Sequence, residues 1–318
     1  LTEYKVDGFR FDLTKGFTNN QSNESTAKNY DKDRVEILKG YKDYIMTVKS
    51  DAVIILEHFC CDQEEKELAD AGMKVWRNLN GAYRDAAKGK SSNFSGLYTE
   101  KDIPFGTYVG YMESHDEERN MFSAQEYGTS GVKNDYKVRL KRAGLNAAFF
   151  LLVPGPKMIW QFGELGYDYS IYYNGDRTAK KPWVTDDYFH DANRRALYDT
   201  YASLLKFRFD NPRFFDADAD FRWGVGGSDW PGRYIFCTND DGFGGRDTFA
   251  LFGNFGEGRQ NVGITLPHAG PWYDYYTYDA SVSRSEGVWN GTTHTANMAE
   301  GSFFLLVDDP ALCLSNRK

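Results

Sequence analysis

Cysteine and long apolar runs are both scarce in this sequence, and each shortage excludes a class of protein. Four cysteines in 318 residues are too few for a disulfide scaffold. Cys60 and Cys61 are adjacent and cannot easily pair with each other, whereas the pairing of Cys237 with Cys313 stays open. No apolar stretch reaches the roughly 18 residues of a membrane-spanning helix. Residues 1–7 do not resemble a signal peptide.

Positive charge and phosphate-binding loops are lacking as well. The net charge of −8 and pI of about 5.3 would repel nucleic acid and anionic membranes, so we expect neither as a partner. No glycine-rich turn stands between a strand and a helix, which disfavours a nicotinamide or nucleotide enzyme. His58 lies beside Cys60 and Cys61, but no second ligand pair has metal spacing. We therefore expect no metal site or cofactor in this chain.

Aromatic residues, in contrast, are abundant at 16% of the chain. Sugar rings stack on aromatic faces, so this content would suit a polysaccharide-binding protein. β-rich cores also contain many aromatic residues. On composition alone, the second explanation is favoured.

The first two thirds of the chain alternate predicted strands with predicted helices. Apolar runs indicate strands at 6–11, 52–56, 73–76, 107–112 and 157–160. Helical periodicity indicates helices at 31–50, 64–71, 132–152 and 191–209. Strand followed by helix, repeated, predicts an α/β fold with a parallel sheet.

The pattern changes after Pro212. Short strands are predicted at 234–236, 248–252, 262–265, 272–278 and 302–307, separated by Gly, Asn and Asp. The glycine clusters at 224–227 and 242–245 fit hairpin turns. These features predict an antiparallel β-sandwich. We thus expect two domains, 1–212 with the parallel sheet and 213–318 with the sandwich.

Three acidic residues stand at the ends of predicted parallel strands. Asp12 ends the first strand, Glu57 the second and Asp116 the fourth. Residues just past the C-terminal ends of such strands face a shared pocket in barrel enzymes. Any one of these acids alone is more readily a helix cap or a solvated loop charge. Three at matching positions indicate an active site.

Glycoside cleavage requires such a set of carboxylates. One attacks the anomeric carbon and a second protonates the departing oxygen. Arg10 lies two residues before Asp12, on the same face of the strand, where its guanidinium keeps a nucleophilic carboxylate ionised. The apolar run before Glu57 favours the protonated form that a general acid needs.

Four segments carry a resemblance to a known family. Residues 8–15, GFRFDLTK, resemble the nucleophile motif of the α-amylase family, the family 13 glycoside hydrolases. Glu57 resembles the acid/base of that family, and Ser114-His115-Asp116 its transition-state motif. Residues 154–164 are similar to the last barrel strand and the turn after it. The resemblance implies a partial (β/α)8 TIM barrel, about strands 4 to 8, followed by the β-sandwich.

The resemblance also implies roles for individual residues. Asp12 would be the nucleophile, Glu57 the acid/base and Asp116 the stabiliser of the transition state. The implied substrate-binding residues are Arg10, Lys15 and His115. The implied activity is a retaining α-1,4-glucan hydrolase of the α-amylase type acting on starch or maltooligosaccharides. An α-glucanotransferase or α-glucosidase of the same family, or a non-catalytic starch-binding module, stays an alternative.

The sequence departs from the family pattern in three respects. Gly16 replaces a usual His and Ser114 a usual Asn. Gly16 lies near the common calcium site, so calcium stays open for an intact parent protein. About five of eight barrel strands are accounted for, so we expect a fragment that is a poor enzyme alone and self-associates through its open sheet edge. Starch is too large to enter cells, so we expect a secreted, cell-surface or periplasmic parent.

Overall fold

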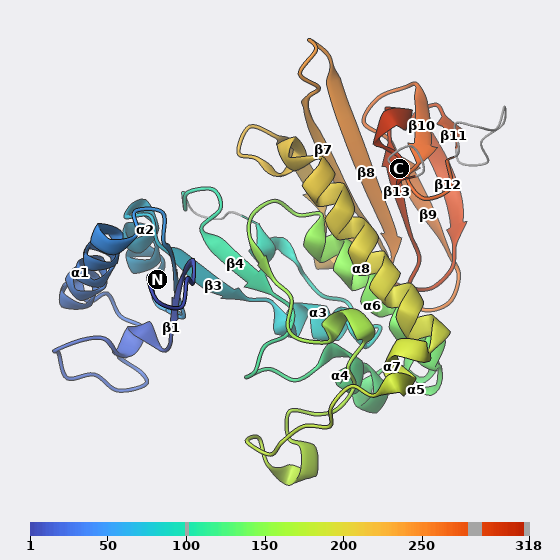
Figure 1. The fold of residues 1–318 in the computed structure, drawn as a ribbon. Coiled ribbons are helices and arrows are strands. Elements are labelled where there is room, and N and C mark those ends of the chain that lie inside the picture. The colour runs from blue at the N-terminus through green and yellow to red at the C-terminus, as the bar shows by residue number, and fades with distance from the viewer. Residues whose placement is uncertain (99–101, 279–287, 315–318) are drawn as a thin grey trace. The chain divides into compact units, whose positions relative to one another are not determined.

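The computed structural model describes residues 1–98, 102–278 and 288–314 (Figure 1). Two compact units make up the chain. Unit 1 comprises 1–78, 96–111 and 155–158, and unit 2 comprises 79–95, 112–154 and 159–318. Residues on both sides of 212 belong to unit 2, and the predicted domain boundary at that point stays a prediction.

Unit 1 contains a parallel five-stranded sheet. Its strands follow one another in chain order: β1 Gly8–Phe11, β2 Val53–Leu56, β3 Lys74–Asn78, β4 Tyr108–Tyr111 and β5 Lys157–Met158. Helix α1, Lys32–Val48, connects β1 to β2, and helix α2, Asp62–Asp70, connects β2 to β3. The predicted parallel α/β arrangement is therefore confirmed, as part of a barrel.

Apolar side chains cover both faces of this sheet. On one face, Val35 and Leu38 of α1 and Leu68 of α2 pack with Ile54 and Leu56 of β2. On the other face, Trp76, Val109 and Tyr111 form a second buried cluster. All four residues of β4 are buried, so burial on both faces explains its continuous apolar run, whereas Val53 of β2 is exposed.

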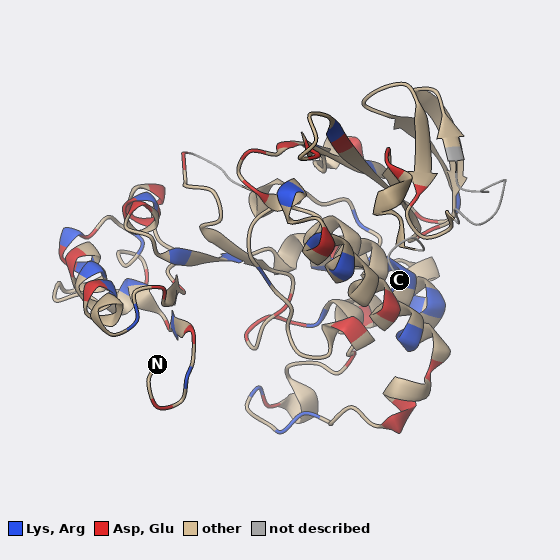
Figure 2. Ribbon diagram, turned by 45° about the horizontal axis from the view of Figure 1, so that its top comes forward, with Lys and Arg blue, Asp and Glu red and all other residues tan. Residues whose placement is uncertain are grey.

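Helix α1 shows how local sequence sets an element of unit 1. The carboxylate of Asp31 accepts hydrogen bonds from the amides of Asp33 and Arg34 and so caps the first turn. Acidic and basic residues are interspersed along the helix (Figure 2). Tyr41 and Tyr44 are exposed on it.

Unit 2 contains most of the helices. These are α3 Asn80–Ala87, α4 Asn120–Tyr127, α5 Ser130–Asn134, α6 Tyr136–Leu151, α7 Asp186–His190 and α8 Ala192–Asp210. The single helix predicted at 132–152 is wrong, because the Asp135 carboxylate accepts from the amides of Lys137 and Val138 and starts a new helix. Helices α3 and α4 were not predicted. Each has eight residues and lacks a capping side chain.

The antiparallel part of unit 2 consists of a six-stranded and a two-stranded sheet. The strands are β6 Asp220–Gly224, β7 Gly232–Asp240, β8 Arg246–Asn254, β9 Gln260–Thr265, β10 Pro271–Asp274, β11 Val288–Asn290, β12 Thr293–Met298 and β13 Phe303–Val307. The larger sheet has the order β11-β10-β13-β8-β7-β6, and β9 pairs with β12. Phe252, Ile264, Trp272 and Leu306 form the core between the two sheets.

Each predicted strand of this region overlaps an observed one, but the strand predicted at 272–278 is too long, and β6, β11 and β12 were not predicted. Residues 242–245 connect the antiparallel strands β7 and β8, as a hairpin turn does. The strand predicted at 272–278 ends at Asp274, whose carboxylate accepts hydrogen bonds from the amides of Tyr276 and Thr277. A side chain that bonds its own following backbone favours a turn over a strand.

None of the four cysteines forms a disulfide. Cys237 and Cys313 are buried, and their sulfurs approach the carbonyl oxygens of Phe214 and Asp274 at 3.0 and 3.9 Å. In the part of the chain that the structure describes, no helix combines the length and apolarity needed to cross a membrane.

Candidate active site

Strand register brings Asp12 and Glu57 to the same level of the unit 1 sheet. Phe11 of β1 pairs with Leu56 of β2, so the next residue on each strand is an acid. The amide of Glu57 donates to the carbonyl oxygen of Phe11 at 3.0 Å. The two carboxyl-bearing residues are therefore neighbours across adjacent parallel strands, as their positions in the sequence predicted.

The guanidinium of Arg10 contacts both carboxylates. Its Nη1 donates to Oδ1 of Asp12 at 2.5 Å, and its Nη2 lies 2.9 Å from Oε2 of Glu57 as an ion pair without hydrogen-bond alignment. The guanidinium carbon also lies 4.1 Å from the centre of the Trp76 ring, within cation–π range. Arg10 is thus fixed from three sides and bridges the two acids.

The two carboxylates differ sharply in exposure. The side chain of Asp12 is 75% exposed and that of Glu57 only 10% exposed. Glu57 does not lie in an apolar surrounding, as the run before it suggested, because Arg10 and a backbone amide face it. An exposed carboxylate beside a guanidinium can reach an incoming substrate, while the buried one is held in a single position.

Backbone groups complete the fixation of Glu57. The amide of Leu13 donates to Oε2 of Glu57 at 2.9 Å. Leu13 adopts the left-handed conformation, with φ 44° and ψ 48°, which is strained for a residue with a Cβ. The amide of Thr14 donates to the carbonyl oxygen of Glu57 at 2.9 Å. The turn after β1 is therefore shaped around Glu57.

Lys15 belongs to the short 3-10 helix Thr14–Gly16 that follows this turn. The carbonyl oxygen of Lys15 accepts from Nη1 of Arg34 at 2.8 Å, which holds the backbone of this segment. Gly16, where a His was expected from the family pattern, has open space around its Cα.

His115 and Asp116 lie in unit 2, on the segment that follows β4. Nε2 of His115 is 3.5 Å from Oδ1 of Asp116, and Arg177 forms an ion pair with the same oxygen. The hydroxyl of Ser114, which replaces the expected Asn, accepts from the amide of Asp116 at 3.0 Å and bonds the carboxylate of Glu117. The side chain of Asp116 is half-exposed.

A buried ion pair holds the segment around Asp116 in place. Nη1 of Arg119 lies 3.2 Å from Oε2 of Glu113 and donates to the carbonyl oxygen of Gln161 at 2.9 Å. The other oxygen of Glu113 accepts from the amide of Asn120 at 2.6 Å. These contacts fix both ends of the turn that carries His115 and Asp116.

A cavity of about 190 Å³ opens beside His115 in unit 2. Its walls include the aromatic rings of Trp160, Tyr167 and Tyr169 and the cations Arg119, Arg177 and Lys181. The His115 and Trp160 ring centres are 6.0 Å apart. Aromatic faces next to hydrogen-bond donors suit a sugar ring, which has apolar faces and a polar rim.

The predicted residues therefore form two groups. Arg10 contacts both Asp12 and Glu57 in unit 1, and His115 contacts Asp116 in unit 2. Reading the sequence missed Trp76 and Arg177. Trp76 could have been found, because it ends the predicted third strand, one strand beyond Glu57. Arg177 lies in an irregular loop, and we see no sequence signal for it.

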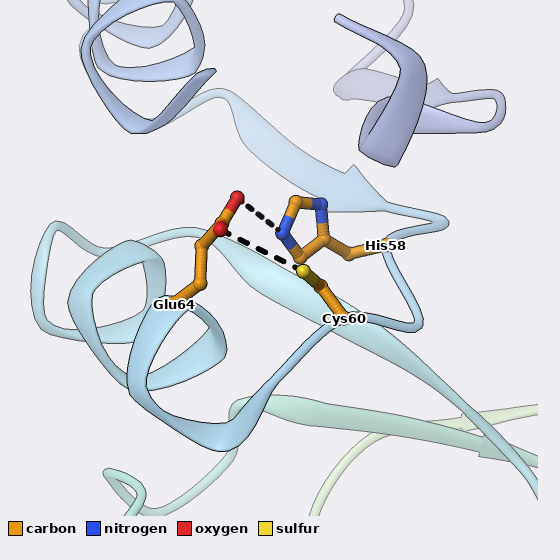
Figure 3. A group of neighbouring side chains, drawn as sticks. All are labelled: His58, Cys60 and Glu64. Atoms are coloured by element: carbon orange, nitrogen blue, oxygen red, sulfur yellow. Dashed lines mark hydrogen bonds and ion pairs between the residues drawn. The ribbon is translucent and has the colours of Figure 1, made fainter. Parts of the chain in front are cut away.

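A buried cluster behind Glu57 contains His58, Cys60 and Glu64, three residue types that bind metals (Figure 3). Arg34 fills it: Nε donates to Oε1 of Glu64 at 2.5 Å, and Nη2 donates to Oε2 at 2.8 Å and to Sγ of Cys60 at 3.0 Å. Burial opposes ionisation of Glu64, but hydrogen bonds from His58 and Arg34 outweigh it and lower its pKa to about 2. Calcium prefers six or more oxygen ligands, so these donors do not fit it.

Solved structures of α-amylases and pullulanases share this fold. The α-amylase from H. orenii matches 96% of this chain over 61% of its own, with TM-score 0.59 and 16% identity. The Geobacillus thermoleovorans α-amylase, solved with acarbose, matches 95% over 60%, with TM-score 0.57 and 13% identity. The Paenibacillus barengoltzii pullulanase matches 96% over 48%, with TM-score 0.62 and 18% identity.

The chain spans about 60% of the length of these α-amylases and about half that of the pullulanase. Neither a protein-family model nor a curated protein matches the sequence. At these identities the likeness establishes the fold. The chain thus has the fold of α-amylases and pullulanases, a partial barrel followed by an antiparallel β domain, as the motif resemblance predicted.

Proposed function

We propose that this chain carries the catalytic carboxylates of a retaining α-1,4-glucan hydrolase of the α-amylase type. The observation that carries the proposal is the single guanidinium of Arg10 in contact with both Asp12 and Glu57. A shared cation keeps the two carboxylates close to each other, and a close pair is what retaining glycosidases use.

In the proposed reaction, Asp12 is the nucleophile and Glu57 the acid/base. An oxygen of Asp12 attacks the anomeric carbon while Glu57 gives its proton to the departing glycosidic oxygen. Glu57 then takes a proton from water, and that water releases the sugar from Asp12. The exposure of Asp12 and the fixed position of Glu57 support this division of roles.

Asp116 and His115 are proposed to bind the sugar at which cleavage occurs. Their contact with each other and their position beside the cavity that Trp160 and Tyr169 line support this role. Lys15 is proposed to reach a sugar on the leaving-group side.

The choice of an α-glucan rests on the structural neighbours and on the motifs. One of these α-amylases was solved with acarbose, and two pullulanases were solved with maltose and maltotetraose. Because α-amylases and pullulanases match with similar scores, the fold does not select the linkage. A glucanotransferase or α-glucosidase stays the alternative, and products from maltoheptaose separate them, since a transferase makes oligomers longer than its substrate.

The location of the protein follows from its proposed substrate. Starch is a polymer too large to enter a cell, so an enzyme that cleaves it works outside the cytoplasmic membrane. We propose secretion or attachment to the cell surface. Cell fractionation of the natural source, with starch-degrading activity and this chain followed together, tests this.

The first experiment is reducing-sugar release from soluble starch. We expect activity from the full natural protein that contains this chain, and loss of at least three orders of magnitude in Glu57→Gln, because general acid catalysis alone contributes about 10² to 10⁴. Glu24→Gln, on an exposed loop, serves as the matched control. If the protein is inert on every α-glucan, binding of starch without cleavage is the function to test next.

A further inference from the structure

A series of contacts between the buried side chains of Glu64, His58 and Thr14 leads to the backbone of Glu57. We call these contacts the relay. Oε1 of Glu64 lies 3.0 Å from Nε2 of His58 (Figure 3). Nδ1 of the same ring lies 2.9 Å from the hydroxyl of Thr14. That hydroxyl and the amide of Thr14 lie 3.0 and 2.9 Å from the carbonyl oxygen of Glu57. Thr14, His58 and Glu64 are each completely buried.

We propose that Glu64, acting through His58 and Thr14, positions Glu57 and the turn that carries Asp12. The inference rests on the proposed function, in which Glu57 and Asp12 react with the glucan. His58 follows Glu57 directly and Thr14 follows Asp12 by two residues. The contact between Thr14 and His58 therefore ties the end of β1 to the end of β2 at the point where both acids emerge.

The proton arrangement follows from the charge of Glu64. A carboxylate can only accept, so the His58 nitrogen that faces it, Nε2, carries hydrogen. In the neutral ring Nδ1 only accepts, so it competes with the carbonyl oxygen of Glu57 for the single hydroxyl proton of Thr14. The amide of Thr14 donates to that carbonyl oxygen in either arrangement. A carboxylate–imidazole–hydroxyl chain of this kind fixes the tautomer and orientation of the ring.

Arg34 holds the far end of the chain. It bonds both oxygens of Glu64, and the amide of Asp31 donates to Oε2 at 3.0 Å, so the carboxylate cannot turn. Arg34 also bonds the carbonyl oxygen of Lys15, one residue past Thr14. Glu64 thus supports the turn after β1 through His58 and Thr14, and Arg34 supports it through Lys15.

The relay is a positioning device and not a second reactive centre. Thr14, His58 and Glu64 have the order of a nucleophile, base and orienting acid, but all three are fully buried, so no substrate can reach the hydroxyl. Burial also raises the pKa of the Cys60 thiol to about 12, so Cys60 is not a nucleophile. The relay therefore acts on the reaction only through the geometry of Glu57.

The test removes one hydroxyl from the full natural protein. Thr14→Val is nearly isosteric and should lower kcat on soluble starch by about tenfold or more with KM little changed, because small misplacements of a reacting group have large effects on rate. Thr14→Ser keeps the hydroxyl and should restore kcat. Thr47→Val, which removes an exposed hydroxyl bonded to a carbonyl of α1, is the matched control. Equal kcat values for the wild type and Thr14→Val, or no rescue by Thr14→Ser, would overturn the proposal.

A second readout does not depend on hydrolysis. The chain has five histidines, so ¹⁵N ring spectra are tractable, and His58→Gln assigns the His58 signals. We expect a slowly exchanging Nε2–H and a bare Nδ1, with Thr14→Val shifting only the Nδ1 resonance of this ring. A rapidly exchanging ring, or one that Thr14→Val leaves unchanged, overturns the relay. A protein that shows the relay but cleaves no glucan overturns the proposed function instead.

Discussion

The backbone amide of Leu13 donates a hydrogen bond to Oε2 of Glu57 at 2.9 Å, from a residue in the left-handed conformation. A left-handed residue with a Cβ is less favourable by about 1 to 2 kcal/mol. Neighbouring contacts must hold it, and the amide of Thr14 on the carbonyl oxygen of Glu57 is one of them. The amide of Leu13 therefore links the strained backbone of this residue to the buried carboxylate of Glu57.

Leu13→Gly should relieve this strain and keep the amide. The Leu13 side chain is exposed, so little packing is lost. We expect the free energy of unfolding to stay equal or rise by up to about 1 kcal/mol, with glucan hydrolysis retained. Urea denaturation and the starch assay measure both. A clear loss of stability would show that the Leu13 side chain matters more than the backbone conformation.

Arg10→Lys should lower kcat on starch by roughly tenfold or more, even though the charge is kept. An ammonium group cannot contact Asp12 and Glu57 together while stacking on Trp76, as the planar guanidinium does. Steady-state kinetics give the answer. Arg195→Lys, on the exposed face of α8, is the control, and equal activity of the two variants would contradict the bridging role of Arg10.

Acid stability should depend on Glu64. Its pKa is lowered from an ordinary 4.5 to about 2, so the folded state prefers the ionised form. That stabilisation is fully present above pH about 4.5 and is lost as the pH falls through about 2. It corresponds to about 3 kcal/mol at neutral pH. Denaturation from pH 6 down to pH 2 measures it.

Glu64→Gln should weaken the pH dependence in that window and lower stability at pH 7 by about 3 to 5 kcal/mol, because Arg34 loses its buried partner. Glu67→Gln, on the same helix and half-buried, is the matched control and should follow the wild type. If the free energy of unfolding varied with pH in the same way for wild type and Glu64→Gln, the lowered pKa assigned to Glu64 would be contradicted.

Gly8→Ala should destabilise unit 1 by about 1 to 3 kcal/mol. A Cβ at Gly8 would fall on the carbonyl oxygen of Val53, so β1 must move away from β2 and carry Asp12 with it. Thermal unfolding and starch hydrolysis should both decline. Gly16→Ala, where a Cβ meets open space, should leave stability nearly unchanged. Equal effects of the two substitutions would exclude this explanation.

The chain is expected to self-associate through strand β1. This strand lies at one end of the five-strand order, and its outer edge is not paired with another strand among the described residues. Tyr4, Val6 and Phe9 near this edge are exposed by 83%, 40% and 40%. Open apolar edges favour pairing with another chain. Sedimentation at micromolar concentration should show a dimer, and a clean monomer would contradict it.

The strands and most long helices could be predicted because their causes are local. Continuous apolar runs mark β2 and β4, and the carboxylates of Asp31 and Asp191 start α1 and α8. The sequence also marks Asp135 as a cap, but helical periodicity on both sides concealed the break between α5 and α6. The short α3 and α4 have no such signal, because packing and not capping stabilises them.

The candidate residues could be predicted for a related reason. In a parallel sheet, the residue after each strand lies at a common edge, so Asp12 and Glu57 follow from the strand pattern alone. Arg10 follows from its spacing before Asp12. Trp76 also follows from its place at the end of the predicted third strand. Arg34 and Arg177 could not be predicted as partners, because they reach these residues from distant points in the chain.

The sequence by itself determined the strand-helix order, the change to antiparallel strands after Pro212 and the adjacency of the acids on β1 and β2. The first two depend on residues close together in the chain, and the third depends on the position of each acid directly after its own strand. Only the tertiary structure decided that Arg10 bridges Asp12 and Glu57. It also decided that Leu13 adopts a strained backbone conformation and donates its amide to Glu57. The same holds for Arg34, which fills the cluster of His58, Cys60 and Glu64. Those contacts depend on how folding brings distant side chains together, which local periodicity does not encode.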